Sequence, residues 1–395
     1  MKISICIPQY NRIEYLIKSL DELQGQSYSD FEVVISDDCS QDDTTNQIQE
    51  YLKASKYPIT YFRFDQNQGY DRNLRKSMEL AVGEYCFVLG NDDTLSHSHV
   101  LRDLEDFLVK NNFPDLGFCN YQEYSNDKIL TRRALETKII GAGPDIGIKN
   151  YSCFSFVGGL IFKKSTFDQY NTEIFDRSIF AQIALALNMI CNGAILFSIN
   201  ESWVKKDITI GNDEKSNSYR DFINRSYTKI KPADGGLMSV INVLSKVLDQ
   251  NKMLTMARMN YIFSKILFNT YPFWILDYKR NKATPAAIGL YLGLMPHRFV
   301  QFARLNSLQK VKFTIGFQVI SNFANDYGDG IKGTDTIRIG EERMVSSGKI
   351  SPKQMKLAII YTSILTIIIA VMLIYKAFGS SNFGYSLLFF CLGII

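Results

Sequence analysis

The sequence lacks closely spaced cysteine pairs, although seven cysteines are distributed along its 395 residues. Structural zinc sites and redox dithiols need such pairs, so neither is expected, and the cysteines are interpreted as small apolar residues in a reducing compartment. A basic leader with a long apolar core is also absent from the amino terminus, where Met1 is followed directly by an alternating, strand-like run at residues 2–8. We therefore expect the amino-terminal part of the chain to stay in the cytosol.

A large excess of one charge is missing as well, because 44 Lys and Arg residues face 40 Asp and Glu residues, for a net charge of +4. Proteins that bind nucleic acid by neutralising phosphates need a larger basic excess, so this class is excluded. The hydrophobic fraction of 46% and the charged fraction of 21% exclude a mainly disordered chain. At roughly 150 residues per domain, the length predicts two or three domains.

The first 110 residues alternate short apolar runs with amphipathic stretches, which is the pattern of βα units in a parallel sheet. The predicted strands are residues 3–7, 31–36, 59–64 and 85–89, and the predicted helices are residues 14–23, 43–54, 71–81 and 99–110. The fold class is therefore predicted to be α/β, with an open, Rossmann-like sheet. Such sheets bind ligands at the carboxyl ends of their strands, so the residues that directly follow each strand are the first candidates for a site.

Two pairs of adjacent aspartates follow two of these strands, Asp37 with Asp38 and Asp92 with Asp93. Carboxylates can hold the divalent cation that neutralises a nucleotide diphosphate, and a separate carboxylate can accept hydrogen bonds from a base or a ribose. Aspartate after a strand is also an ordinary turn residue or helix cap, so either pair alone leaves both interpretations open. Two pairs at two strand ends meet both needs of a nucleotide site.

Five sequence blocks occur in an order that resembles family 2 glycosyltransferases of the GT-A fold. They are ICIPQYNR at residues 5–12, VVISDDCS at 33–40, NQG at 67–69 followed by Arg72 and Asn73, AVGEY at 81–85, and LGNDD at 89–93. The resemblance covers roughly residues 1–200. It implies transfer from a nucleotide-diphosphate sugar, with Mn²⁺ or Mg²⁺ as the cofactor.

The resemblance assigns a set of residues to the binding of the nucleotide sugar: Pro8, Tyr10, Asn11, Asp38, Asn67, Arg72, Asn73, Asn91 and Asp92. Within this set Asp38 is expected to contact the base. Asp92 and Asp93 match the Asp-x-Asp-type sugar and metal motif of the family. Residue 90 is Gly where the family often has Asp, which leaves the metal to Asp92 and Asp93, with Asp93 favoured as the direct ligand.

Inverting transfer needs a general base that takes the proton of the acceptor hydroxyl. The family usually carries this base in a Glu-Asp pair before an amphipathic helix, and the pair is missing here. The nearest carboxylates are Glu173 and Asp176, before a helix predicted to begin near Ser178, and Asp176 is favoured as the base. An amino-terminal cap of that helix is an equally good interpretation of Asp176. His97 and His99 are interpreted as exposed residues at the start of a helix and not as metal ligands.

Long apolar runs fall almost entirely after about residue 285. Residues 286–305 are predicted to be amphipathic and apposed to a membrane. Residues 357–375 are 19 uncharged positions in a row, which reach roughly the 30 Å of a hydrocarbon core, and we predict a transmembrane helix there.

A second polar cluster precedes this segment and comprises Asn325, Asp326, Asp329 and Asp335. With the basic stretch that follows, it resembles the first aspartate-rich motif of UbiA-type prenyltransferases, and most closely the 1,4-dihydroxy-2-naphthoate polyprenyltransferases of menaquinone synthesis. The resemblance covers about residues 310–395. That family needs further helices and a second aspartate-rich motif, so the fragment is expected to be inactive alone. The alternative is that this tail serves only as a membrane anchor.

The predicted organisation has three parts: a GT-A glycosyltransferase domain at residues 1–225, a helical region at 226–309, and the prenyltransferase-like membrane fragment at 310–395. The leading hypothesis is an inverting hexosyl- or deoxyhexosyltransferase that extends a polyprenyl-linked saccharide in surface polysaccharide synthesis. It would work at the cytoplasmic face of the cell membrane, with carboxy-terminal transmembrane segments and without nucleic acid. The alternatives are prenyl transfer to dihydroxynaphthoate and a nucleotide-binding scaffold without turnover.

Overall fold

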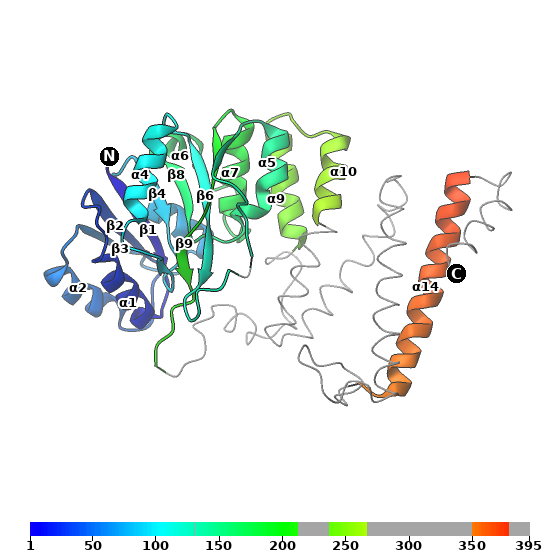
Figure 1. Cartoon of the computed structure of the whole chain (residues 1–395), viewed down its shortest axis with the longest axis horizontal. Coiled ribbons are helices and arrows are strands. Elements are labelled where there is room, and N and C mark those ends of the chain that lie inside the picture. Colours follow the sequence, from blue (N-terminus) through cyan, green and yellow to red (C-terminus); the bar gives the residue numbers. More distant parts are fainter. Residues whose placement is uncertain (130, 212–236, 267–349, 379–395) are drawn as a thin grey trace. The chain divides into compact units, whose positions relative to one another are not determined.

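The computed structural model describes residues 1–129, 131–211, 237–266 and 350–378 (Figure 1). The first part alternates strands and helices in the order β1 (Ile3–Gln9), α1 (Ile13–Leu23), β2 (Phe31–Asp37), α2 (Thr44–Ala54), β3 (Ile59–Arg63), α3 (Tyr70–Glu79), β4 (Tyr85–Val88), β5 (Thr94–Leu95) and α4 (Val100–Lys110). The second part comprises β6 (Leu116–Glu123), β7 (Lys138–Gly141), α5 (Pro144–Asn150), a 3₁₀ turn (Tyr151–Phe154), β8 (Leu160–Lys163), α6 (Lys164–Tyr170), α7 (Ala181–Cys191) and β9 (Leu196–Lys206). Helices α9 (Leu237–Gln250), α10 (Met256–Lys265) and α14 (Pro352–Phe378) follow.

The four predicted strands and four predicted helices of the first 110 residues are all present, and no predicted end differs from the observed one by more than two residues. The apolar alternation explains this agreement. In β1, for example, Ile3, Ile5 and Ile7 all belong to one buried cluster. A strand buried on both sides forms because its neighbours cover both faces.

The strands form one mixed sheet in the order β3-β2-β1-β4-β8-β6-β9-β5, with β7 paired to β9. β1 runs parallel to β2 and to β4, and β2 runs parallel to β3. β8 is antiparallel to both β4 and β6. The predicted open parallel sheet is therefore confirmed for the first four strands, and the later strands make the whole sheet mixed.

Helices cover both faces of the sheet because the strand order reverses. The chain moves outward from β1 to β2 to β3 and then returns past β1 to β4. Right-handed crossovers in opposite directions place α1 and α2 on one face and α3 on the other. Residues of α1 and α4, such as Leu16 and Leu104, share a buried cluster with β1 and β2, whereas α3 packs on β1 and β2 with Leu74 and Met78 outside that cluster.

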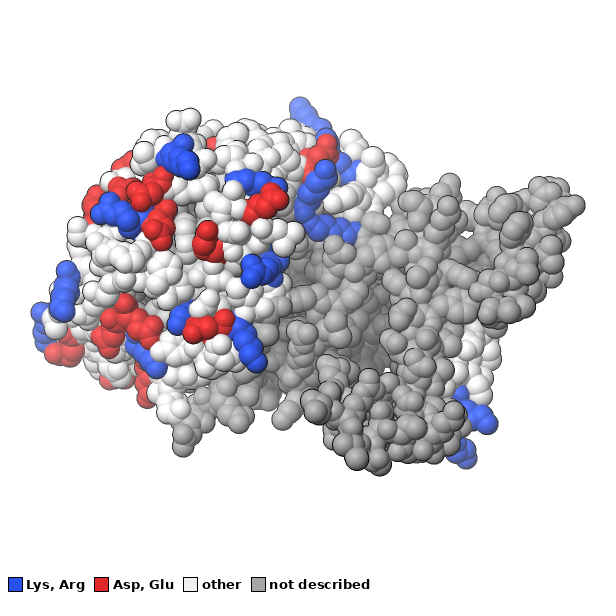
Figure 2. All heavy atoms as spheres, in the orientation of Figure 1, with Lys and Arg blue, Asp and Glu red and all other residues white. Residues whose placement is uncertain are grey.

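Charged side chains are mixed over the surface. On the face shown in Figure 2, the acidic and basic residues that the structure describes lie interspersed and form no large basic patch. This distribution agrees with the small net charge of the chain.

The chain divides into two compact units, residues 1–293 and 294–395, which are described separately. In the second unit the predicted segment 357–375 falls within helix α14. Among the residues that the structure describes, no helix combines the length and the apolar character that crossing a membrane requires.

Several other predictions fall outside the described residues. These are the amphipathic stretch 286–305, the polar cluster with Asn325, Asp326, Asp329 and Asp335, and the boundaries proposed at residues 225 and 309. The three-part division of the chain stays a prediction.

Candidate active site at the carboxyl ends of the parallel strands

The reversal of strand order beside β1 fixes where a ligand site is expected. Connections leave β1 and β4 in opposite directions, and open α/β sheets bind their ligands beside such a reversal, at the carboxyl ends of the strands. Gln9 at the end of β1 is in register with Asp37 at the end of β2. β4 ends at Val88, so the turn at residues 89–93 emerges at the same edge.

One turn, residues 9–12, holds both acidic pairs at this edge. On one side, Asp38 N–H donates to the carbonyl of Gln9 at 2.9 Å. On the other side, Asn91 Nδ2 donates to Gln9 Oε1 at 2.8 Å, and Arg12 Nη2 lies 3.0 Å from Asp92 Oδ2. Asn11 and Arg12 both adopt a left-handed backbone, with φ of 55° and 63°. The two acidic pairs therefore converge, as the sequence predicted.

Asp38 is buried and its carboxylate is bound by the loop before α3. Gln68 N–H and Gly69 N–H donate to its two oxygens at 2.6 and 2.9 Å, and Asn67 Nδ2 donates to its carbonyl at 3.2 Å. Burial raises the pKa of Asp38, while the two N–H groups oppose that rise. Asp38, which is predicted to contact the base, is therefore hydrogen-bonded to the residues that directly precede α3.

Asp37 has a structural role beside it. Its side chain is fully buried and accepts hydrogen bonds from Ser40 N–H at 2.9 Å and from Tyr61 Oη at 2.7 Å. Arg63 Nε lies 3.6 Å from the same carboxylate. Asp37 and Asp38 therefore have different partners, and Asp37 stabilises the ends of the strands.

Asp93 is the more enclosed member of the second pair, with 3% of its surface exposed. Burial and the charges of Asp92 and Asp207 raise its pKa well above the usual value. Its Oδ2 lies against two glycines, because a Cβ built on Gly90 would lie 2.6 Å from this atom and one on Gly158 would lie 2.7 Å from it. The position of Asp93 thus explains why residue 90 carries no side chain here.

The residues present fit a divalent cation. Adjacent carboxylates offer the hard oxygen ligands that Mg²⁺ and Mn²⁺ prefer, and a cation would relieve the repulsion that raises the pKa of Asp93. Within the described ranges, no cluster of three or more His, Cys, Asp or Glu residues is arranged around a metal position. Asp92 and Asp93 are the residues that would hold such an ion.

The chain after β9 lies over this acidic turn. Ile208 N–H donates to the carbonyl of Asp92 at 2.8 Å, and Asp207 N–H donates to Asp93 Oδ1 at 3.3 Å. Lys206 lies within 2.7 Å of both Glu123 and Asp207. These residues are not among the predicted site residues, because nothing near them in the sequence marks a contact with such distant positions.

Arg133 supports the loop that carries Gly158 and was also missed. Its guanidinium donates to the carbonyls of Cys153 at 3.1 Å, Phe156 at 2.8 Å, and Gly158. It also lies over the ring of Phe156. Arg133 therefore stabilises the backbone conformation of the loop at Gly158, which faces Asp93.

The other residues assigned to the nucleotide occupy different environments. Tyr10 is exposed and Pro8 is half-buried at the end of β1. Asn73 Nδ2 donates to the carbonyl of Gln9 at 2.9 Å, so Asn73 lies beside the same turn. Arg72 instead pairs with Glu79 at 2.6 Å, along the side of α3. The predicted roles of these residues stay predictions.

The segment before α7 carries both candidate bases. Glu173 is exposed, whereas both oxygens of Asp176 accept hydrogen bonds from Arg75, at 2.9 Å from Nε and 2.6 Å from Nη2. The helix begins at Ala181 and not near Ser178, and its first turn is capped from another element. Asp71 of α3 accepts hydrogen bonds from Ile179 N–H at 2.7 Å and Ala181 N–H at 3.1 Å. The interpretation of Asp176 as the cap of this helix is therefore wrong.

His97 and His99 are exposed at the start of α4, as predicted. His99 Nδ1 lies 2.9 Å from Ser27 Oγ, which joins it to the loop after α1.

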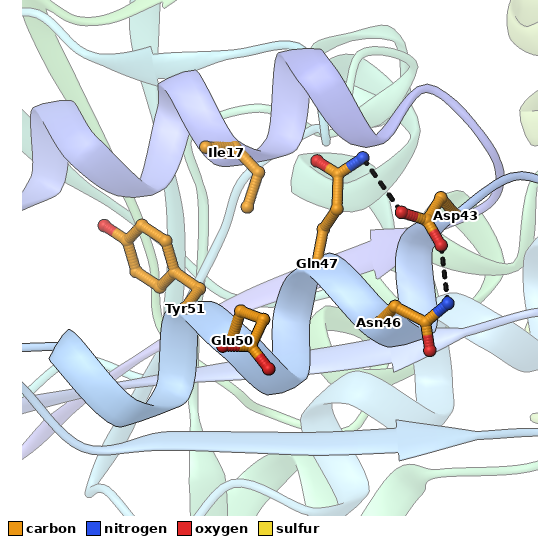
Figure 3. A pocket seen from close by; sticks show the side chains of 6 residues that line it. All are labelled: Ile17, Asp43, Asn46, Gln47, Glu50 and Tyr51. Carbon is orange, nitrogen blue, oxygen red and sulfur yellow. Dashed lines mark hydrogen bonds between the residues drawn. The ribbon is translucent and has the colours of Figure 1, made fainter.

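A shallow pocket of about 340 Å³ lies elsewhere, between α1 and α2 (Figure 3). Ile17 points into it from α1, and the other lining residues are Asp43, Asn46, Gln47, Glu50 and Tyr51. Asn46 and Gln47 donate hydrogen bonds to Asp43, so several of its polar groups bind one another. It contains none of the predicted site residues.

Comparison with known proteins agrees with this geometry. Residues 4–180 match the family described as glycosyl transferase family 2. An abequosyltransferase of Salmonella typhimurium is 33% identical over 184 aligned residues, which cover 42% of this chain and 54% of the relative. A GalNAc(5)-diNAcBac-PP-undecaprenol beta-1,3-glucosyltransferase of Campylobacter jejuni is 30% identical over 181 residues, covering 44% and 56%. The chain thus spans about half the length of these relatives.

A crystal structure of S. aureus TarS in complex with UDP has a TM-score of 0.50 to this chain at 17% identity, covering 70% of this chain and 75% of that one. The fold is therefore the GT-A fold of glycosyltransferases. The chain carries a glycosyltransferase family 2 domain, and it is related to glycosyltransferases of bacterial surface polysaccharides. The comparisons give no support to the prenyltransferase-like part predicted for residues 310–395, nor to the alternative function drawn from it.

Proposed function

We propose that this chain transfers one hexose or deoxyhexose from a nucleotide-diphosphate sugar to a polyprenyl-linked saccharide, with inversion at the anomeric carbon. The observation that carries the proposal is the turn at residues 9–12, which contacts both acidic pairs at the carboxyl ends of the strands. An isolated acidic pair is commonly a turn. Two pairs joined through one strained turn at a topological switch point support a built nucleotide-sugar site.

The donor would lie along this turn. Asp38, whose carboxylate already organises Gln68 and Gly69, would meet the base, and Asn11 and Asn73 would line the nucleotide. Asp92 and Asp93 would hold Mn²⁺ or Mg²⁺. When bound, the cation supplies positive charge that stabilises the leaving nucleoside diphosphate.

The acceptor hydroxyl would be activated from the segment before α7. Asp176 is our proposed general base, because its carboxylate is held in one orientation by two hydrogen bonds from Arg75. It would take the hydroxyl proton as the acceptor oxygen attacks the anomeric carbon from the face opposite the diphosphate. Glu173, which is exposed on the same segment, is the alternative base.

A lipid-linked acceptor is supported by the Campylobacter jejuni relative, whose name specifies a saccharide on PP-undecaprenol. We propose that the enzyme works where such carriers are accessible, at the cytoplasmic face of the cell membrane.

Release of nucleoside diphosphate from a panel of UDP-, dTDP- and GDP-sugars with Mn²⁺ tests the donor half of the proposal. We expect the full chain to consume one of these donors, and Asp93→Ala to lose at least about 100-fold in turnover. Asp103→Ala is the matched control, because Asp103 is an exposed acid on α4 that contacts no predicted site residue, and it should behave as wild type. The proposal fails if the wild-type chain neither binds nor consumes any donor.

The acceptor half is tested with the donor that proves active. Transfer to a saccharide on a polyprenyl diphosphate should be faster than transfer to the same saccharide without the lipid. Equal rates would contradict a lipid-linked acceptor while leaving the donor assignment intact.

A further inference from the structure

Three charged residues of α3 lie four positions apart, at Asp71, Arg75 and Glu79, and therefore share one face of the helix. Asp71 and Arg75 are almost completely buried, with 1% and 4% of their surfaces exposed. The three side chains bind the same stretch of chain, residues 171–181. A helix face that buries charge in this way needs partners of opposite charge or matching hydrogen-bond character, and here one segment supplies them.

Arg75 contacts both this segment and Glu79 of its own helix. Beyond its two hydrogen bonds to Asp176, its Nη1 donates to Asn171 Oδ1 at 2.9 Å and to Glu79 Oε1 at 3.1 Å. Asn171 Nδ2 donates in turn to Glu79 Oε1 at 2.9 Å. The planar guanidinium therefore fixes Asp176 in two directions at once, which a lysine cannot do.

The backbone that directly follows Asp176 is strained. Arg177 has φ of 69° and Ile179 has φ of 59°, and a left-handed backbone is a true outlier for a β-branched residue such as Ile179. Asp71 stabilises this conformation, because it accepts hydrogen bonds from the N–H groups of Ile179 and Ala181. Strain of this kind persists where surrounding contacts determine the conformation, and it gathers at functional sites.

The other end of the same helix contacts the donor side. Gly69 N–H, directly before α3, donates to Asp38, and Asn73 Nδ2 donates to the carbonyl of Gln9. A single helix of ten residues thus touches the proposed base-binding carboxylate, the turn at residues 9–12, and the segment that carries Asp176.

We propose that Arg75 is a positioning residue that holds Asp176 in the orientation needed to accept the proton of the acceptor, with α3 as the rigid link between donor and acceptor sides. The inference rests on the proposed glycosyltransferase function. Stability alone is a weak reason for this arrangement, since a buried ion pair can often be replaced by apolar residues without loss. The bidentate hydrogen bonds, the strained backbone that follows Asp176 and the shared helix all concern the same carboxylate.

The test separates turnover from donor binding. Using the nucleotide sugar found active in the panel, the turnover for donor consumption and the Kd of the matching nucleoside diphosphate with Mn²⁺ are measured for wild type, Arg75→Lys and Arg75→Met. Arg75→Met should lose about 100-fold in turnover, because the carboxylate is no longer held. Arg75→Lys should recover part of that loss, and the Kd should change less than twofold in both.

Arg102→Lys is the matched control, since Arg102 is an exposed arginine on α4 whose Nη1 pairs with Glu105 at 2.7 Å. It should keep wild-type turnover and Kd. Wild-type turnover in Arg75→Met, or a loss that appears only as weaker nucleotide binding, would overturn the proposal.

A double-mutant cycle with Asp176→Asn distinguishes positioning from general support of the fold. If Arg75 acts through Asp176, Arg75→Lys should cause no further loss of turnover in the Asp176→Asn background. Fully additive losses would mean that Arg75 acts independently, and the proposal would be wrong. This cycle uses the conservative variant, so it remains informative even if Arg75→Met does not fold. If wild type consumed no donor, the proposed function would fail first, and this inference with it.

Discussion

The donor side and the segment before α7 are built in different ways. At the ends of β1, β2 and β4, most of the contacts have a backbone group as one partner, such as the carbonyl of Gln9 and the N–H groups of Gln68 and Gly69, beside the side-chain pair of Arg12 with Asp92. The segment at residues 171–181 is held by charged side chains of α3, which are separated from their partners by about a hundred positions, as in Arg75 with Asp176.

This difference teaches which part of the site tolerates change. Backbone contacts persist through most substitutions, so the donor side should respond mainly where a side chain would meet the proposed cation or where added volume displaces Asp93. The segment at 171–181 depends on individual charges, and each of them carries a measurable share of its stability.

The largest effect is expected for Gly158→Ala on the donor side. The added Cβ would lie 2.7 Å from Asp93 Oδ2 and 2.8 Å from the ring of Phe156, so the carboxylate must move. Because a displacement of about 1 Å in a site can cost about 100-fold, turnover for donor consumption should fall by about that factor. Gly25→Ala is the control, since its Cβ would meet only the carbonyl of Glu22 at 3.4 Å. Equal turnover in the two variants would contradict the packing of Asp93.

The next effect is expected for Asp71→Ala, on the stability of the fold. The substitution leaves the buried N–H groups of Ile179 and Ala181 without their acceptor, which should lower the free energy of unfolding by about 2 kcal/mol. Denaturant unfolding measures this change. Asp103→Ala, which removes an exposed acid from the first turn of α4, should change the same quantity by less than about 0.5 kcal/mol. Similar losses in both variants would mean that Asp71 does not brace the segment.

The smallest effect concerns Glu79 and depends on pH. Burial opposes its ionisation, but hydrogen bonds from Asn171 and Arg72 and the charges of Arg72 and Arg75 lower its pKa overall. A lowered folded-state pKa adds stability above the unfolded value near 4.5, and this contribution is lost as pH falls through the folded value. Glu79→Gln should therefore cost about 1 kcal/mol at pH 7 and progressively less below about pH 4. A cost that does not vary with pH would show that the charge of Glu79 contributes nothing.

The fold of the first 110 residues could be predicted because its strands are short, apolar and followed by polar residues at one edge. The convergence of Asp38 with Asp92 followed from the same pattern, since parallel neighbours end together. The later strands were harder, because β8 enters the sheet antiparallel between β4 and β6, which no local periodicity signals.

The contacts of the candidate base segment could not be predicted for a related reason. Asp71 and Arg75 lie on either side of Arg72 and Asn73 on the same short helix, and the resemblance drew attention to the latter pair only. The four-residue spacing of Asp71, Arg75 and Glu79 was visible in the sequence, but solvent-exposed helix faces show the same spacing. Only burial distinguishes the two cases, and burial depends on residues 171–181 folding back over α3.

The hydrogen bonds of Asp207 and Ile208 have a practical consequence for handling the protein. The chain leaves β9 against the acidic turn, so a linker, epitope or fluorophore inserted after Thr209 would begin a few residues from Asp92 and Asp93. Met1 precedes β1 at the opposite end of the strand, where its amino group lies 3.1 Å from Glu105. An affinity handle fused there would be separated from the candidate site by the length of β1, and is the safer attachment point for immobilising the protein.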